Sequence, residues 1–412
     1  MAEKVNSPES ENGDRLLPYG RQYIDDDDID AVVSALRSDY LTTGPLVAKF
    51  EHKICEITGA THAAAVSNGT AALHLAYLSL GIGEGDIVIV PSITFLSSAY
   101  TAMLVGAEIV FSDVDSKTGL MTANHLRNAI SQCDPERIKA VCVVHLNGQC
   151  ADMAEIWDIA KQYNIRVVED ACHAIGGKYK DRTCWENVGS CKYSDLTVFS
   201  FHPVKTIAMG EGGAVVGRCG ERLERIRSLR NHGMTRDVGK FTDRSQAFSS
   251  TGVANPWYYE QHELGYNYRV PDILCALGIS QLSKIDMFVK KRRDLVDCYR
   301  RMLGCYGDVL QSTQIFGVQK PAWHLYVCLI DFEKIRISRA DVMERLRKKN
   351  ILTNVHYIPL YRQPVFSGCG DIAEFPGAEA YYAQCLSLPL FFDMEEREVE
   401  RVVNSLVEVV NL

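Results

Sequence analysis

Two patterns of hydrophobic residues alternate along the first two thirds of the chain. Short apolar runs, each the length of a strand, are separated by longer stretches in which apolar residues recur every three or four positions. The first pattern predicts buried strands and the second amphipathic helices. The predicted strands are 87–90, 109–111, 141–144, 167–168 and 196–199, and 153–163 is one of the helices between them. The alternation predicts an α/β fold, with a mostly parallel central sheet flanked by helices.

The pattern changes near residue 284. A long charged helix is followed by a predicted strand at 323–330, a helix at 338–348, a strand at 352–357 and two closing helices. We therefore expect a large α/β domain over 16–283 and a smaller α+β domain over 284–412. Residues 1–15 are polar and lack periodicity, which predicts a flexible tail.

An acidic run occupies residues 25–28 and permits two interpretations. Carboxylates can bind a metal ion, but they also stabilise the first turn of a helix, where backbone N–H groups are unpaired. The run directly precedes apolar residues at helical spacing, namely Ile29, Val32, Val33 and Leu36. This order favours a helix start.

Composition excludes several classes of protein. The 44 Lys and Arg against 52 Asp and Glu give a net charge of −8, so we expect no nucleic acid or anionic membrane as partner. No apolar run approaches the roughly 20 residues that span a bilayer. The 14 cysteines form no CxxC pair and follow no secretory leader. These features predict a cytoplasmic protein with reduced thiols and no bound metal, although the cysteine count alone also permits a metal-binding or scaffold protein.

Polar residues follow the ends of two predicted strands, where ligands bind in open parallel sheets. Asp170 follows 167–168, and Lys205 lies on the turn after 196–199, just before the glycine-rich segment 210–213. A lysine that forms a Schiff base must lose its proton, and a protonated pyridine nitrogen needs a carboxylate beside it. The combination indicates a site for pyridoxal 5′-phosphate (PLP).

Other residues supply what the rest of this cofactor needs. Gly69 and Thr70 open a predicted helix whose free N–H groups can bind a phosphate, and Ser200 adds a hydroxyl. Phe95 is available to cover the ring. Each residue alone also has an ordinary interpretation as a helix entrance, a cap or a core side chain. The order of the residues along alternating strands favours the cofactor site.

Several motifs resemble those of the nucleotide-sugar aminotransferases, the DegT/DnrJ/EryC1/StrS family of fold-type I PLP-dependent transferases. The most specific is Ser200-Phe201-His202-Pro203-Val204-Lys205 followed by Gly210-Glu211-Gly212-Gly213. Further matching segments span almost the whole chain after the tail, at residues 18–22, 41–45, 169–177, 230–233, 264–269 and 354–359.

The resemblance implies roles for particular residues. Lys205 would form the Schiff base with PLP, Asp170 would hold the pyridinium nitrogen and His173 the phenolic oxygen. Ser200, Gly69 and Thr70 would bind the phosphate, and Asn267 would reach the phosphate in the neighbouring subunit, which implies a homodimer with shared active sites. The residues implied to contact the sugar nucleotide are Tyr19, Leu41, Thr42, Thr43, Gly44, Asn354, Val355, His356 and Tyr357.

Within the family, His173, the segment 256–261 and the His356-Tyr357 pair resemble the pseudaminic-acid branch. That branch implies transfer of an amino group from L-glutamate to C4 of a UDP-linked 4-keto-6-deoxy-N-acetylhexosamine. Another UDP- or dTDP-linked keto-sugar, aminated at C3 or C4, stays open, as does a non-catalytic regulator with this fold. A related dehydratase would carry histidine in place of Lys205.

Overall fold

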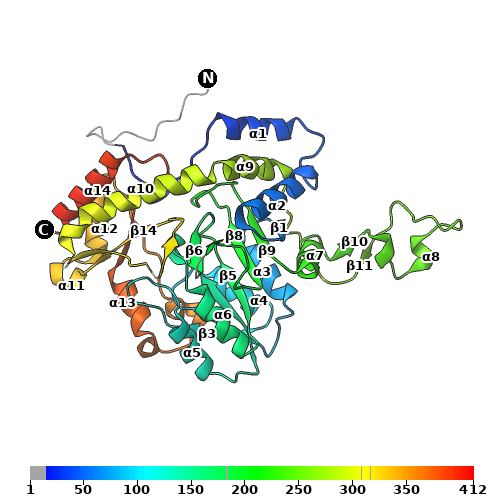
Figure 1. Ribbon diagram of the computed structural model, residues 1–412, viewed down its shortest axis with the longest axis horizontal. Coiled ribbons are helices and arrows are strands. Elements are labelled where there is room, and N and C mark those ends of the chain that lie inside the picture. The colour runs from blue at the N-terminus through cyan, green and yellow to red at the C-terminus, as the bar shows by residue number, and fades with distance from the viewer. Residues whose placement is uncertain (1–14, 182–183, 308, 316) are drawn as a thin grey trace.

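The computed structural model describes residues 15–181, 184–307, 309–315 and 317–412, and a sheet lies at the centre of its larger part (Figure 1). In spatial order its strands are β1 (His62–Val66), β9 (Gly213–Gly217), β8 (Leu196–Ser200), β5 (Arg166–Asp170), β4 (Ile138–Val144), β2 (Ile87–Pro91) and β3 (Glu108–Ser112). Among these described strands only β9 runs antiparallel to the rest. The mostly parallel sheet confirms the predicted fold class.

Helices cover both faces of this sheet, because successive strand residues point to opposite sides. In β2, Val88 and Val90 pack on one face, whereas Ile87 and Ile89 pack on the other. The first face is covered by α3 (Gly69–Ser79), α4 (Ser97–Leu104) and α7 (Gly220–Leu229). The second is covered by α5 (Ala123–Ser131), α6 (Met153–Gln162), α2 (Pro45–Thr58) and α9 (Asp272–Ser283).

The five strands predicted for this sheet are present, but the sequence pattern missed β1 and β9. Three of the five residues of β1 are alanine, and β9 begins and ends with glycine. Neither residue type favours strands, so the periodicity signal there is weak. The two strands pair with each other at one end of the sheet, beside the start of α3.

The C-terminal part contains a second, antiparallel sheet of β12 (Leu310–Ser312), β14 (Tyr326–Ile330) and β15 (Cys385–Leu388). Around it lie α10 (Ile285–Leu303), α11 (Phe332–Ile335), α12 (Arg339–Lys348), α13 (Pro376–Gln384) and α14 (Glu396–Val409). The helix predicted at 338–348 is confirmed, and the Ser338 side chain caps it. In these described ranges, no helix combines the length and the apolar character that crossing a bilayer requires.

The strand predicted at 352–357 is wrong. This segment makes only one isolated bridge with β15, between Asn354 and Ser387, and then leaves the sheet. Its side chains Val355 and Tyr357 are half-buried against the main core, and both line a cavity rather than forming a ladder. A strand missing from the prediction, β15, takes the place beside β14.

The acidic run begins a helix, as predicted. Asp25 caps α1 (Asp26–Leu36) by accepting from the Asp28 amide at 3.1 Å, and Asp28 accepts from the Asp25 amide at 3.2 Å. The Lys284 ammonium lies 2.6 Å from Asp25 and 2.8 Å from Asp28. The carboxylates therefore fasten α1 to the end of α9.

The predicted tail falls almost entirely outside the described residues, which begin at Arg15. Arg15 forms an ion pair with Asp393 at 2.9 Å, and Leu17 pairs with Ile351. Both contacts join the start of the described chain to its C-terminal part. The division into 16–283 and 284–412 stays a prediction.

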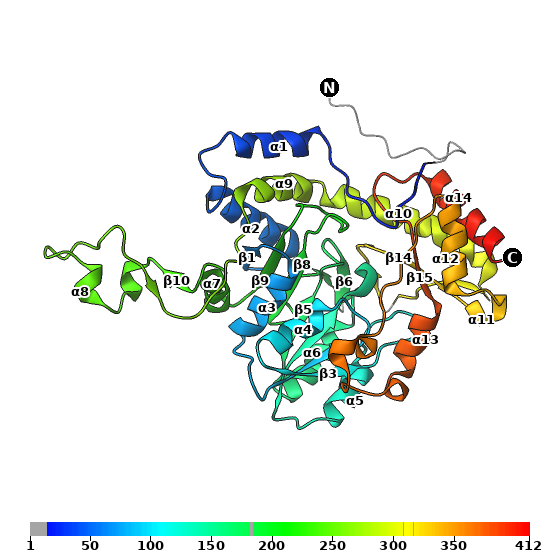
Figure 2. The same ribbon diagram turned by 180° about the vertical axis from the view of Figure 1, so that it is seen from behind.

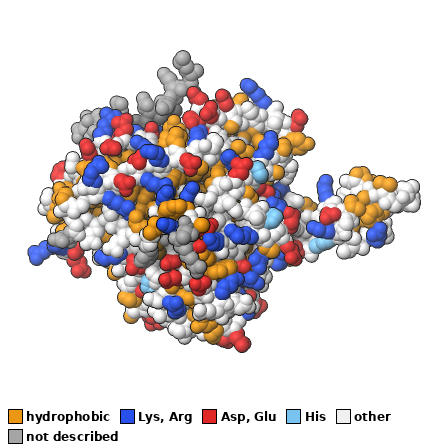
Figure 3. Space-filling model, viewed as in Figure 1, with side chains coloured by type: hydrophobic (Ala, Val, Ile, Leu, Met, Phe, Trp, Pro, Cys, Tyr) orange, Lys and Arg blue, Asp and Glu red, His pale blue; other side chains and the backbone are white. Residues whose placement is uncertain are grey.

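A long arm, residues 234–262, projects from the body of the molecule (Figures 1 and 2). It holds the short strands β10 (Met234–Thr235) and β11 (Glu260–Gln261) and the helix α8 (Arg244–Ala247). Its apolar side chains Val253, Trp257 and Tyr259 are exposed. Figure 3 shows apolar side chains gathered at the arm's end, whereas charges of both signs are interspersed over the body.

A small three-stranded sheet is separate from the central one. The strands β6 (Lys178–Asp181) and β7 (Cys184–Asn187) form a hairpin, and β13 (Gln319–Lys320) pairs with β6. The β13 pairing brings the C-terminal part of the chain against the hairpin that follows β5.

Candidate active site

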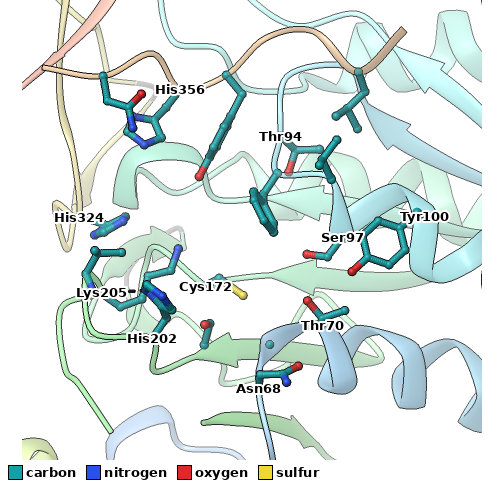
Figure 4. A pocket seen from close by; sticks show the side chains of 18 of the residues that line it. Asn68, Thr70, Thr94, Ser97, Tyr100, Cys172, His202, Lys205, His324 and His356 are labelled. Atoms are coloured by element: carbon teal, nitrogen blue, oxygen red, sulfur yellow. Dashed lines mark hydrogen bonds between the residues drawn. The ribbon is translucent and has the colours of Figure 1, made fainter. Parts of the chain in front are cut away.

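A cavity of about 840 Å³ opens at the carboxyl ends of β2, β5 and β8. Figure 4 shows Lys205 and Cys172 between the segments that carry Thr94 and His356 and the helix start that carries Asn68 and Thr70. The residues that line this cavity include Tyr19, Asn68, Gly69, Thr70, Thr94, Phe95, Tyr100, Cys172, Ser200, Lys205, Tyr268, His324, Asn354, Val355, His356 and Tyr357.

Asp170 ends β5 and is buried beneath this cavity. Its Oδ2 accepts a hydrogen bond from Ser98 Oγ at 2.7 Å, and its Oδ1 accepts from the Cys172 amide at 3.2 Å. The carboxylate is thus held in one orientation from two sides.

Lys205 lies on a tight turn after β8. The Phe201 amide bonds to Gly212, the Met209 amide bonds back to Phe201, and the Lys205 amide bonds to His202 at 2.9 Å. Burial lowers the pKa of the Lys205 ammonium, although the nearby Cys172 thiol and Asp170 carboxylate raise it. A lowered pKa favours the neutral amine, the form that reacts with a carbonyl group.

The glycine-rich segment after Lys205 allows close backbone packing. A Cβ atom on Gly213 would lie 2.3 Å from the carbonyl oxygen of Asn68. Glycine at this position therefore lets β9 begin directly against the start of α3. The loop helps to place Lys205 and the helix start on the same cavity.

The predicted phosphate site is at the start of α3. Asn68 caps the helix by accepting from the Ala71 amide at 2.8 Å, and Gly69, Thr70 and Ser200 line the cavity beside this helix start. A Cβ on Gly69 would lie 2.8 Å from Ser200 Cβ and 3.3 Å from Cys172 Sγ. Gly69 keeps this corner open, and a helix start with free N–H groups favours an anion.

His173 lies behind Tyr357 on the cavity wall. Its Nδ1 accepts from the Asn147 amide at 3.3 Å, so the proton of the neutral ring is on Nε2, which lies 3.2 Å from the Tyr357 hydroxyl. Burial, together with Lys205 and His356, lowers the pKa of His173 well below its usual value. The ring is neutral at physiological pH and presents an N–H donor toward Tyr357.

Two further histidines near Lys205 are also neutral. Burial, with Lys205 nearby, lowers the pKa of His356 to about 3, and its Nδ1 lies 2.7 Å from the Ser387 hydroxyl. Burial lowers the pKa of His324 well below its usual value, and its ring centroid lies 4.5 Å from that of His173. These three histidines therefore add no positive charge to this part of the cavity.

A second buried acid, Glu169, fixes the end of β5. Its Oε2 lies 2.8 Å from His145 Nε2, and its Oε1 accepts from the hydroxyls of Ser194 and Thr197. Burial alone would raise the pKa of Glu169, but these hydrogen bonds lower it below its usual value. The His145 amide also donates to the Asp170 carbonyl at 3.1 Å, so Glu169 and its partners help to hold Asp170 in place.

Most of the predicted site residues meet at the cavity. Gly69, Thr70, Phe95, Ser200 and Lys205 line it, with Asp170 and His173 just behind the lining. Of the predicted substrate contacts, those that also line it are Tyr19, Asn354, Val355, His356 and Tyr357. The exposed Phe95 ring lies 6.1 Å from the Tyr357 ring, so the two aromatic side chains face the same space.

Two predicted parts of the site lie elsewhere. Asn267 is exposed and forms a bridge with Asn231. Leu41, Thr42 and Thr43 are exposed before α2, and Thr43 and Gly44 line a separate hollow of about 290 Å³. Three arginines line the same hollow, Arg227, Arg230 and Arg269. A single chain does not bring these residues to the cavity that holds Lys205.

Other residues that line the cavity were not among the predicted site residues. His324 precedes a strand in an otherwise apolar stretch, and Tyr100 and Tyr268 resemble ordinary core aromatics. Thr94 lies in the bend after β2, and Ser98 lies four residues later in the first turn of α4. That spacing was the one clue available in the sequence.

These residues fit PLP. A lysine with a lowered pKa, a buried carboxylate and an open helix start with two hydroxyls lie around one cavity. Lys205 would hold the cofactor covalently, Asp170 would pair with its ring nitrogen, and Gly69, Thr70 and Ser200 would bind its phosphate. The corner that a Cβ on Gly69 would fill matches the need for close approach by a phosphate.

Comparison with known proteins identifies the family. The model of the DegT/DnrJ/EryC1/StrS aminotransferase family matches residues 22–407. The UDP-4-amino-4,6-dideoxy-N-acetyl-beta-L-altrosamine transaminase of Campylobacter jejuni is 34% identical over 394 residues, which cover 96% of this chain and 97% of that protein. The UDP-4-amino-4-deoxy-L-arabinose--oxoglutarate aminotransferase of Shewanella sediminis is 35% identical over 404 residues, covering 96% and 98%.

A solved structure agrees with this result. Helicobacter pylori PseC, an aminotransferase involved in the biosynthesis of pseudoaminic acid, superposes with a TM-score of 0.85 at 26% identity, covering 96% of this chain and 100% of that one. The match extends over the sheet, the cavity and the C-terminal part. The chain therefore belongs to the DegT/DnrJ/EryC1/StrS aminotransferase family and is a PLP-dependent sugar aminotransferase.

Proposed function

We propose that this protein transfers the amino group of L-glutamate to C4 of a UDP-linked 4-keto-6-deoxy-N-acetylhexosamine, as in the pseudaminic-acid type of reaction. The observation that carries the proposal is the cavity itself. The Lys205 amine faces a large space lined by the aromatic side chains of Tyr19, Tyr100, Tyr268 and Tyr357. Aromatic faces with hydroxyl groups suit the apolar and polar faces of a sugar and a nucleotide base.

The relatives support two alternatives for the sugar. The Campylobacter and Shewanella relatives are named for different sugars, yet their identities to this chain are 34% and 35%. Another UDP- or dTDP-linked keto-sugar, aminated at C3 or C4, is therefore the second candidate. A non-catalytic regulator is disfavoured because Lys205, with its lowered pKa, faces the cavity.

Each side chain around the cavity would have its own role in amino transfer. Bound PLP supplies the electron sink that lets an amino group leave one substrate and enter another. The Lys205 amine would take the proton from the α-carbon of glutamate and, in the second half-reaction, deliver a proton to the amino-bearing sugar carbon. Phe95 would cover the cofactor ring, and His173 would hold the phenolic oxygen by turning its Nε2 proton from the Tyr357 hydroxyl to that oxygen. Tyr19 and the 354–357 segment would contact the sugar nucleotide.

We further propose a homodimer in which each cavity is completed by the second copy of the chain. The support is that Asn267 and Leu41 to Thr43 are exposed, and that neither they nor Gly44 line the cavity of their own chain. In a two-fold dimer the same surface serves both copies, so these residues would meet the opposite cavity. A cytoplasmic location is also proposed, supported by free thiols throughout the described chain.

The shared site predicts complementation between two inactive variants. Lys205→Ala removes the amine, and Asn267→Asp places a carboxylate against the phosphate in the partner's cavity. Mixed dimers carry one intact cavity, so refolding the two variants together should restore about one quarter of the wild-type sites. Activity of the mixture, measured against each variant refolded alone, tests this. A mixture no more active than its components would contradict the shared site.

Substrate choice is tested with a panel of nucleotide keto-sugars. Holoenzyme is supplied with L-glutamate and either the UDP-linked 4-keto-6-deoxy-N-acetylhexosamine, its dTDP counterpart or a 3-keto isomer, and 2-oxoglutarate release is followed. We expect kcat/KM for the UDP-linked 4-keto sugar to exceed the others by about 100-fold, because contacts to one sugar carbon and one base typically give this much discrimination. Turnover of a dTDP-sugar alone would contradict the choice of sugar but not the aminotransferase assignment.

A further inference from the structure

A chain of two hydroxyl groups leads from the cavity to Asp170. Ser98 Oγ donates to Asp170 Oδ2 at 2.7 Å, and Thr94 Oγ1 lies 2.8 Å from Ser98 Oγ. Thr94 lines the cavity, whereas Ser98 is fully buried in the first turn of α4. The Tyr77 hydroxyl holds this turn by donating to the Ser98 carbonyl at 3.1 Å.

The direction of the chain follows from the carboxylate. An ionised carboxylate only accepts hydrogen bonds, so the single proton of the Ser98 hydroxyl points to Asp170. The Thr94 hydroxyl must then donate to Ser98. Hydrogen bonds that run in one direction polarise one another, so Thr94 strengthens the bond that Ser98 makes.

The other neighbours of Asp170 on the protein side are neutral. Burial and the negative charge of Asp170 raise the pKa values of the Cys142 and Cys172 thiols, and burial raises that of the Tyr77 hydroxyl. Within the described part of the chain, Asp170 makes no side-chain ion pair. The nearby cation is Lys205. The stability of the buried charge therefore depends on the Ser98 hydroxyl and the Cys172 amide.

We propose that Ser98 and Thr94 are positioning residues that hold the Asp170 carboxylate toward the ring nitrogen of bound PLP and thereby keep that nitrogen protonated. The inference rests on the proposed role of Asp170. The proton shared by the carboxylate and the ring nitrogen stays on the nitrogen only while the carboxylate is the weaker base. Removing the Ser98 donor leaves the carboxylate short of a hydrogen bond, and the proton moves toward Asp170.

The test measures the ring nitrogen directly. The full-length protein is reconstituted with PLP carrying ¹⁵N in the ring, and the ¹⁵N chemical shift is recorded for the wild type and for Ser98→Ala, Thr94→Val and Thr94→Ser. We expect Ser98→Ala to move the shift toward that of a neutral pyridine, which corresponds to a roughly 10- to 100-fold change in the proton-sharing equilibrium. Thr94→Val should give a smaller shift in the same direction, and Thr94→Ser, which keeps the hydroxyl, should match the wild type.

Asp170→Asn separates the two ways the idea can fail. If Asp170→Asn changes the ring shift but folded Ser98→Ala does not, the inference about the hydroxyl chain is overturned. If Asp170→Asn itself leaves the ring shift unchanged, the proposed role of Asp170 is wrong. Equal shifts for Thr94→Val and Thr94→Ser would also overturn the inference, because packing rather than the hydroxyl would then be responsible.

Discussion

Lys205→Ala is expected to abolish transamination, with a loss of about 10⁴-fold or more in kcat, because one side chain both binds the cofactor and moves the proton. The amine faces the cavity, and burial lowers its pKa, so the wild-type side chain is suited to both tasks. The turn that holds Lys205 is built from backbone hydrogen bonds, which the substitution leaves in place. The variant should therefore stay folded.

The matched controls separate chemistry from folding. Lys205→Arg keeps a positive charge but cannot form the imine, so it should be as inactive as Lys205→Ala. Lys139→Ala removes an exposed lysine on β4 and should match the wild type. Initial rates with glutamate and circular dichroism of each variant make the comparison. Wild-type turnover by Lys205→Ala would refute the assignment.

Asp170→Asn is expected to lower kcat by about 10²- to 10⁴-fold, because removing one partner of a buried charge pair costs about 3–5 kcal/mol. The amide has nearly the same shape: its oxygen can still accept from the Cys172 amide, which bonds the carboxylate at 3.2 Å, and its NH2 group can donate to Ser98 Oγ, which bonds the carboxylate at 2.7 Å. The negative charge opposite the ring nitrogen is lost. The effect should thus appear in kcat, with much less change in the melting temperature.

The measurement is steady-state kinetics with glutamate, together with thermal unfolding. Asp158→Asn, an exposed position on α6, serves as the control and should retain wild-type kinetics. If Asp170→Asn kept full kcat, the carboxylate would have no role in activating the cofactor. If it lost activity only by unfolding, its role would be structural.

The central sheet could be predicted in large part because its strands are apolar on both faces. Runs such as 87–90 and 141–144 have no polar alternative, whereas the alanines of β1 and the glycines of β9 are equally compatible with loops. The segment 352–357 was predicted to be a strand, but its residues from Asn354 to Tyr357 line the cavity instead. The sequence pattern does not distinguish a chain that lines a cavity from one that pairs in a sheet.

The site, like the sheet, was only partly predictable from the sequence. Lys205, Asp170 and Gly69 follow strands or open a helix, and such positions are visible in a sequence. Thr94 and Ser98 act through one another over 2.8 Å, and His324 reaches the cavity from a distant part of the chain. These contacts exist only after folding. Asn267 and Leu41 to Gly44 lie outside the cavity of one chain, so their proposed roles depend on a second copy.

The most direct test of the account is to locate the covalent attachment of PLP. Holoenzyme is reduced with borohydride, digested and examined by peptide mass spectrometry, alongside Lys205→Ala treated in the same way. The account predicts a pyridoxyl group on the peptide containing Lys205 in the wild type, and none on any peptide of the variant. A pyridoxyl group on a different lysine of the wild type, or an unmodified Lys205 peptide from fully loaded enzyme, would contradict it.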